Sequence, residues 1–205
     1  MKTSTFPAPT SAGFPLDSAV SAKEDGAADE QLRYAREIIQ MEARALDAVA
    51  VRLSNSFCQA VDLVSHCPGN VIVSGMGKAG LVGQKIAATL ASTGSRSHFL
   101  HPAEAIHGDL GRIHRDDVLL MLSQSGQTEE VVRLLPSIAQ IGAPLVAITG
   151  QGRSKLARAA NIVIELGPLQ EACSLGLAPS TSTTAMLAVG DALALVTSRM
   201  RGFSR

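Results

Sequence analysis

The chain has 205 residues, enough for one domain and an extension, and 46% of them are hydrophobic while only 3% are aromatic. Its 18 basic and 18 acidic residues balance, which argues against a surface that attracts nucleic acid or an anionic membrane. No apolar run is long enough to span a membrane, and the N-terminus lacks the apolar stretch of a signal peptide. We therefore expect a cytoplasmic protein that partners neither nucleic acid nor membrane. Its three cysteines form no C-x-x-C pair, which is typical of idle thiols in a reducing compartment.

The N-terminal third of the sequence changes character at Asp29. Residues 1–28 are rich in Pro, Ser, Thr, Ala and Gly and predict a disordered tail. From Asp29 to the stop signal CPG, apolar residues recur at steps of three and four, which predicts one or two amphipathic helices. These helices either only cover the following domain or also pack on a partner subunit. We therefore expect one domain over residues 29–205, with this helical segment included.

Five short apolar runs follow, separated by stretches long enough for a helix. Because the runs are almost continuously apolar, they indicate strands buried on both faces, as in a parallel sheet. A final helix is expected from about Ser182 to Arg199. The pattern predicts an α/β fold, a three-layer, doubly wound sheet of five parallel strands, with ligands bound beyond the carboxyl ends of the strands. The predicted strands are NVIVS, SHFLH, DVLLMLS, PLVAIT and NIVIEL.

The loop after the first strand, SGMGKAGLVGQK, carries Gly75, Gly77 and Gly80 in G-x-G-x-x-G spacing, with Lys78 inside. A dinucleotide site needs an acid at the tip of the second strand, and SHFLHP has none there. A Walker A loop needs Ser or Thr after Gly-Lys, and Ala79 stands in that place. What remains is either a plain strand-to-helix turn or a glycine turn whose amides face an anion, assisted by the positive charge of Lys78.

The loop after the third strand, SQSGQTEE, places three hydroxyls around a glycine at another strand-to-helix junction. One hydroxyl would suffice to cap a helix, and an ordinary capping cluster is the simpler interpretation. Three hydroxyls together with free amides and a helix N-terminus favour a cradle for one phosphate. The hydroxyls belong to Ser123, Ser125 and Thr128.

The third candidate loop is EACSLGLAPSTSTTAML, residues 171–187. PSTSTT is typical of a helix start, but Glu171 stands among small and apolar neighbours, where a carboxylate can serve as a base. Between the first two loops, HPAEAIHGDLG carries two histidines and two acids whose spacings match no structural zinc pattern, so no metal is expected. Several loops whose amides, hydroxyls or lysine can bind a phosphate, with acids nearby, predict a site for a small phosphorylated sugar rather than a nucleotide.

These motifs resemble the sugar isomerase (SIS) domain family, most closely its arabinose-5-phosphate isomerase branch. The resemblance implies a five-stranded parallel sheet and a homo-oligomer, a dimer or tetramer, with sites near subunit interfaces. It also implies interconversion of D-ribulose 5-phosphate and D-arabinose 5-phosphate, which leads toward the Kdo sugar of lipopolysaccharide. The segments that carry the resemblance are GMGKAG, KIAATLASTG, HPAEAIHGDLG, SQSGQTEEV, AITG, EACSLGLAPSTSTTAMLAVGDALA and RGF.

The resemblance also implies roles for single residues. Glu171 is the expected base of an enediolate mechanism, with Glu130 as a reserve. Lys78 is expected to stabilise the developing oxyanion, and His107, from the same or a neighbouring subunit, to move protons between oxygens. No metal or cofactor is required. The expected substrate contacts are Ser74, Gly75, Gly77, Ser123, Gln124, Ser125 and Thr128.

Two alternatives stay open at this point. One is a 6-phospho-3-hexuloisomerase or another sugar-phosphate isomerase on the same fold. The other is a non-catalytic SIS regulator, which needs the phosphate cradle but no base; the acids and Lys78 favour an enzyme. Members of the arabinose-5-phosphate branch usually continue past RGF into a segment with HPGG, whose histidine is another catalytic candidate, and often into CBS modules. The present sequence ends at RGFSR.

Overall fold

The computed structural model describes residues 18–204, with side chains from residue 27 onward. The chain divides into two units between Ile39 and Gln40, and the second unit contains the sheet. Residues 1–17 of the predicted tail lie outside the described part, and the helix that follows begins at Ser18 rather than Asp29. No helix of the described chain is long and apolar enough to cross a membrane. The elements are α1 (Ser18–Arg52), α2 (Asn55–Ser65), β1 (Val71–Gly75), α3 (Gly77–Ser92), β2 (Ser97–Phe99), α4 (Pro102–Ile106), η1 (Asp109–Arg112), β3 (Val118–Leu122), α5 (Glu129–Ile141), β4 (Leu145–Thr149), α6 (Lys155–Ala159), β5 (Ile162–Glu165) and α7 (Thr181–Met200).

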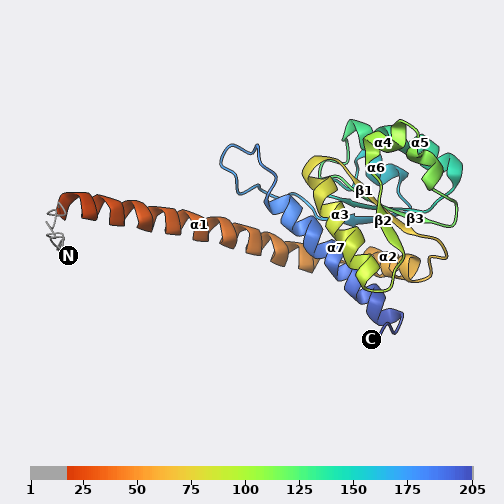
Figure 1. Cartoon of the computed structure of the whole chain (residues 1–205), viewed down its shortest axis with the longest axis horizontal. Coiled ribbons are helices and arrows are strands. Elements are labelled where there is room, and N and C mark those ends of the chain that lie inside the picture. The colour runs from red at the N-terminus through yellow and green to blue at the C-terminus, as the bar shows by residue number, and fades with distance from the viewer. Residues whose placement is uncertain (1–17, 205) are drawn as a thin grey trace, which may run out of the picture. The chain divides into compact units, whose positions relative to one another are not determined.

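The five strands form one sheet in the order β2-β1-β3-β4-β5, and every neighbouring pair is parallel (Figure 1). The predicted five-stranded, doubly wound α/β fold is therefore confirmed. Every residue of β1, β3 and β4 is buried, which explains why their sequences read as continuous apolar runs. The edge strand β2 is only half-buried and correspondingly more polar.

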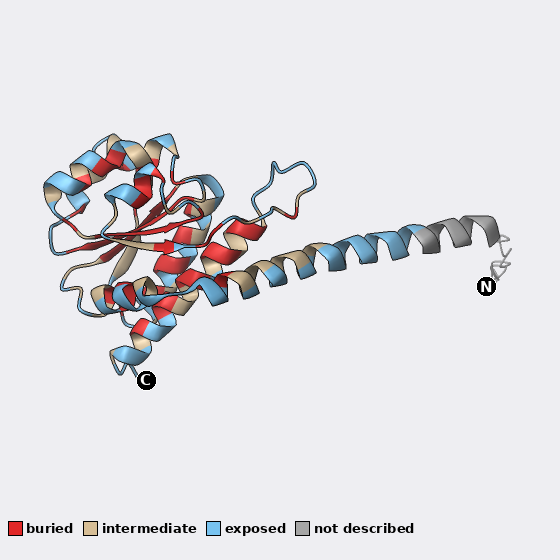
Figure 2. Ribbon diagram, turned by 180° about the vertical axis from the view of Figure 1, so that it is seen from behind, coloured by how far each residue is buried: buried red, intermediate tan, exposed pale blue. Residues whose placement is uncertain are grey.

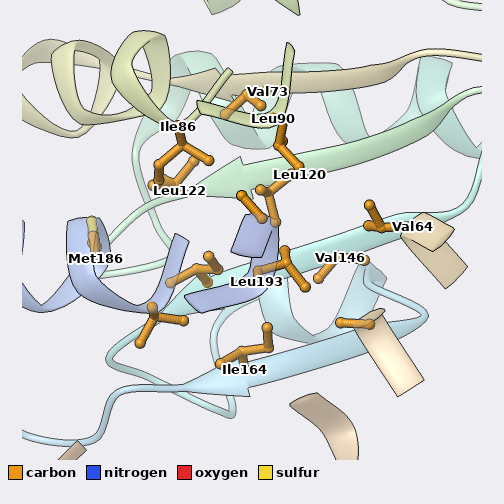
Figure 3. Packing of buried hydrophobic residues seen from close by; sticks show 14 of the residues in the cluster. Val64, Val73, Ile86, Leu90, Leu120, Leu122, Val146, Ile164, Met186 and Leu193 are labelled. Atoms are coloured by element: carbon orange, nitrogen blue, oxygen red, sulfur yellow. The ribbon is translucent and has the colours of Figure 1, made fainter. Parts of the chain in front are cut away.

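Helices cover both faces of the sheet and make two separate cores (Figure 2). Side chains of β1 alternate between them: Val73 packs into the core beneath α2, α3 and α7, and Ile72 packs into the core beneath α4, α5 and α6. Ile86 of α3 and Leu193 of α7 meet the sheet in the first core (Figure 3). Since aliphatic side chains fill both cores, the low aromatic content of the chain is no obstacle to folding.

The strand order reverses direction between β1 and β3, and this switch point positions the site. Gly75, the last residue of β1, pairs with Leu122, the last residue of β3. The turn into α3 and the loop into α5 therefore leave the sheet side by side at its carboxyl edge. In open parallel sheets, ligands bind in the crevice that such diverging connections create.

Candidate active site

A cleft of about 620 Å³ opens at this switch point. Its walls come from four segments that are distant in sequence: the turn after β1, the loop after β3, Gln151 after β4, and the connection from Pro168 into the first turns of α7. Six of the residues predicted from the sequence line it together: Lys78, Ser123, Gln124, Ser125, Thr128 and Glu171.

The loop after β3 is held by its own hydroxyls. Ser123 Oγ accepts a hydrogen bond from the Gly126 amide at 3.0 Å and lies 2.8 Å from Thr128 Oγ1. Ser125 Oγ accepts from the Gln127 amide at 3.1 Å. Thr128 occupies the N-cap position of α5, yet its hydroxyl pairs with Ser123 and does not cap the helix. The first amides of α5 therefore receive no capping bond from the Thr128 side chain, and uncapped amides at a helix N-terminus are suited to an anion.

The turn after β1 has a different construction. Met76 occupies the N-cap of α3 and its apolar side chain makes no capping bond. Gly77 adopts φ +58°, with open space where a Cβ would stand, and the exposed Lys78 follows it along the cleft wall. A positive φ favours glycine strongly over any residue with a side chain. The turn therefore presents uncapped helix amides beside one positive charge, a suitable neighbour for a phosphate or an oxyanion.

Two predicted contacts in this region lie behind the cleft wall. Ser74 is 1% exposed and its hydroxyl donates to the Leu100 carbonyl at 2.7 Å, which ties β1 to the segment after β2. A Cβ on Gly75 would lie 3.1 Å from the Ala79 carbonyl oxygen and 3.2 Å from that of Leu122. Both residues support the turn by close packing, and neither they nor Gly77 line the cleft.

Glu171 is half-buried and held by the start of α7. Its Oε2 accepts hydrogen bonds from the amides of Ser180 and Ser182, at 2.8 and 3.4 Å. The Ala172 amide in turn donates to Thr181 Oγ1 at 3.1 Å. A carboxylate from outside the helix therefore caps α7, in place of the serine at its N-cap, whose side chain makes no capping bond. The same acid lines the cleft together with Ser123 and Thr128.

Comparison with known proteins identifies the family. A family model described as SIS domain matches residues 65–196. The chain belongs to the SIS domain family. This match covers the sheet, the cleft and most of α7.

Relatives of this SIS domain are named for one reaction. Arabinose 5-phosphate isomerase KdsD of Pseudomonas aeruginosa is 50% identical over 173 residues, covering 84% of the chain and 53% of the relative. Arabinose 5-phosphate isomerase KpsF of Escherichia coli O6:H1 is 47% identical over 169 residues, covering 82% and 52%. The chain thus spans about half the length of the curated relatives it matches. Among solved structures, c3406 of Escherichia coli CFT073 in complex with arabinose 5-phosphate superimposes with a TM-score of 0.84 at 38% identity, over 86% of this chain and 94% of that one.

Two predicted catalytic residues of the SIS domain do not line the cleft of their own chain. His107 is exposed and occupies the C-cap of α4. Glu130 is half-buried in the first turn of α5, where an acid is favourable beside the helix N-terminus. Among side chains 27–204, no three His, Cys, Asp or Glu residues gather closely enough to hold a metal ion.

Gln151, Thr183 and Met186 are among the cleft-lining residues that the sequence analysis did not name. Gln151 follows β4 at the same edge of the sheet, so the rule that ligands bind there gives a reason to look for it. Thr183 belongs to the PSTSTT segment, and its hydroxyl donates to the carbonyls of Pro179 and Ser180. Met186 comes from the second turn of α7 and has no local sequence signal.

The loop beside Glu171 also contains a free thiol, that of Cys173. Nearby backbone amides, that of Ala178 above all, favour the thiolate and lower the pKa of the Cys173 thiol below its ordinary value. Burial raises the pKa of Cys67, which lies at the amino end of the sheet. The two thiols therefore differ in the fraction of thiolate at neutral pH.

Proposed function

We propose that the chain is the catalytic domain of an aldose–ketose isomerase that interconverts D-arabinose 5-phosphate and D-ribulose 5-phosphate. The observation that carries the proposal is that the carboxylate of Glu171 lines the same cleft as the hydroxyl cradle and Lys78. A phosphate held by the cradle would fix the sugar and bring its reacting carbons to the acid. The names of the relatives and the arabinose 5-phosphate complex of a structural neighbour support this choice of sugar.

In the proposed reaction, Glu171 removes the proton from C2 of the aldose and returns it to C1. The C2–H electrons form the C1–C2 double bond of an enediolate, and the charge on the C1 oxygen is stabilised by Lys78. Movement of one proton from O2 to O1 completes the ketose, and we assign this transfer to His107. Glu130 remains the reserve base. The scheme balances without a metal or a redox cofactor.

We also propose that the enzyme acts as a homo-oligomer, a dimer or a tetramer. His107 lies outside the cleft of its own chain, so a second copy is the proposed source of this residue for each site. The helical segment before the sheet is the proposed packing element. A phosphorylated sugar does not diffuse across a membrane, and we therefore place the enzyme in the cytoplasm, on the route to the Kdo sugar.

The test is a proton-exchange assay by NMR with ribulose 5-phosphate in deuterated water. Deuterium at C2 of newly formed arabinose 5-phosphate would support the proposal. Excess inorganic phosphate serves as a control, since it should compete for the cradle and suppress the exchange. If the chain turns over a 6-phospho-3-hexulose but not ribulose 5-phosphate, the hexulose becomes the assigned substrate in place of the pentose. Binding of the sugar phosphate without exchange or product would favour a non-catalytic regulator.

A further inference from the structure

We infer that Gly150 is a positioning residue for substrate recognition: its missing side chain leaves the space occupied by the Gln124 amide, whose Oε1 accepts a hydrogen bond from a sugar hydroxyl. The inference rests on the proposed function for the identity of the ligand. Gly150 closes the AITG motif, which no step of the proposed reaction uses.

The first observation concerns Gln124 itself. It lines the cleft together with Ser123, Ser125 and Gln151, yet its Oε1 is buried and has no hydrogen-bond partner within the described part of the chain. A buried amide oxygen without a partner costs free energy, and such groups are uncommon in folded proteins. A sugar hydroxyl is the natural donor here, because the cradle beside Gln124 holds the phosphate of the same molecule.

The second observation is the contact between Gln124 and Gly150. A Cβ on Gly150 would lie 2.7 Å from Gln124 Cδ and 3.0 Å from its Oε1, and would overlap Nε2. Gly150 is buried but does not line the cleft, so it meets the substrate only through this amide. The Gln124 side chain therefore packs directly against Gly150.

The third observation is that a methyl group on Gly150 would displace the Gln124 side chain and not the backbone. The Gly150 amide donates to the Gln124 carbonyl at 3.0 Å, and Thr149 Oγ1 donates to the same oxygen at 3.4 Å. These bonds join the two backbones at the ends of β3 and β4. Gly150 does not have a positive φ, so alanine fits its backbone without strain. A methyl group there would turn the Gln124 amide away while the fold persists.

The experiment is a double-mutant cycle read by calorimetric binding of arabinose 5-phosphate and of inorganic phosphate. Gly150→Ala should weaken the binding of arabinose 5-phosphate about tenfold, the equivalent of one hydrogen bond. The affinity for inorganic phosphate should stay unchanged. In a Gln124→Ala background the same substitution should have no further effect. The matched control is Gly152→Ala in the same loop, whose methyl would meet Glu165 instead and should change neither affinity.

An undiminished effect of Gly150→Ala in the Gln124→Ala background would overturn the inference, as would an equal loss of inorganic phosphate binding. A wild-type chain that binds arabinose 5-phosphate no better than inorganic phosphate would remove the role of Gln124. The NMR resonances of the Gln124 side-chain amide, in the ligand-free chain, should shift in Gly150→Ala but not in Gly152→Ala. If turnover is absent while these binding and NMR results hold, the proposed isomerase fails and the inference stands.

Discussion

Glu171 has two separable tasks in this structure, and two substitutions distinguish them. Its Oε2 accepts bonds from the amides of Ser180 and Ser182, and its carboxylate is the proposed base. Glu171→Gln keeps an oxygen for the amides and removes the base. Turnover should then fall by about 10²–10⁴-fold. The melting temperature should fall by only about 1–2 °C, because the charge–dipole interaction that is lost contributes about 0.5 kcal/mol.

Glu171→Ala removes both tasks. Loss of the cap should cost about 1 kcal/mol, which lowers the melting temperature of a chain of this size by roughly 2–4 °C. Turnover should fall as far as in Glu171→Gln. Thermal unfolding by circular dichroism and initial rates with ribulose 5-phosphate provide the two readouts, and Glu104→Gln, an acid outside the cleft, is the matched control. Activity of Glu171→Gln within about threefold of wild type would refute the base assignment, and an alanine variant as stable as wild type would refute the capping argument.

Three further outcomes follow from the geometry. Gly190→Ala places a methyl group against the fully buried Ile86, so the free energy of unfolding in urea should drop by about 1–3 kcal/mol; an unchanged value would show that α3 and α7 separate easily. Iodoacetamide near pH 7 should modify Cys173 well before Cys67, as followed by peptide mass spectrometry, because its thiol pKa is lowered and that of Cys67 is raised; the reverse order would contradict this. Thr128→Val should weaken inorganic phosphate binding several-fold with little change in melting temperature, and equal binding would remove this hydroxyl from the cradle.

The glycine motif after β1 shows how much of a site the spacing of residues in the sequence can predict. Its spacing left two interpretations open, a plain strand-to-helix turn or a turn that faces an anion, and the structure places Lys78 and the start of α3 at the cleft. The spacing could not show that the glycines differ in purpose. Gly75 permits close packing against the Leu122 carbonyl, whereas Gly77 supplies a positive φ. That difference depends on a strand far along the chain.

The amino-acid sequence by itself determined the elements of this protein. Short apolar runs marked the five strands, and the runs are continuous in β1, β3 and β4 because a strand covered on both faces has no polar side. Three- and four-residue steps marked the helical segment before the sheet. Only the tertiary structure decided which residues meet. The order β2-β1-β3-β4-β5 brings the loops after β1 and β3 together, and the packing of α7 brings Glu171 to them, while Ser74 turns inward and His107 stays outside the cleft. Periodicity is a property of neighbouring residues, whereas these meetings depend on strand pairing and helix packing between segments distant in the chain.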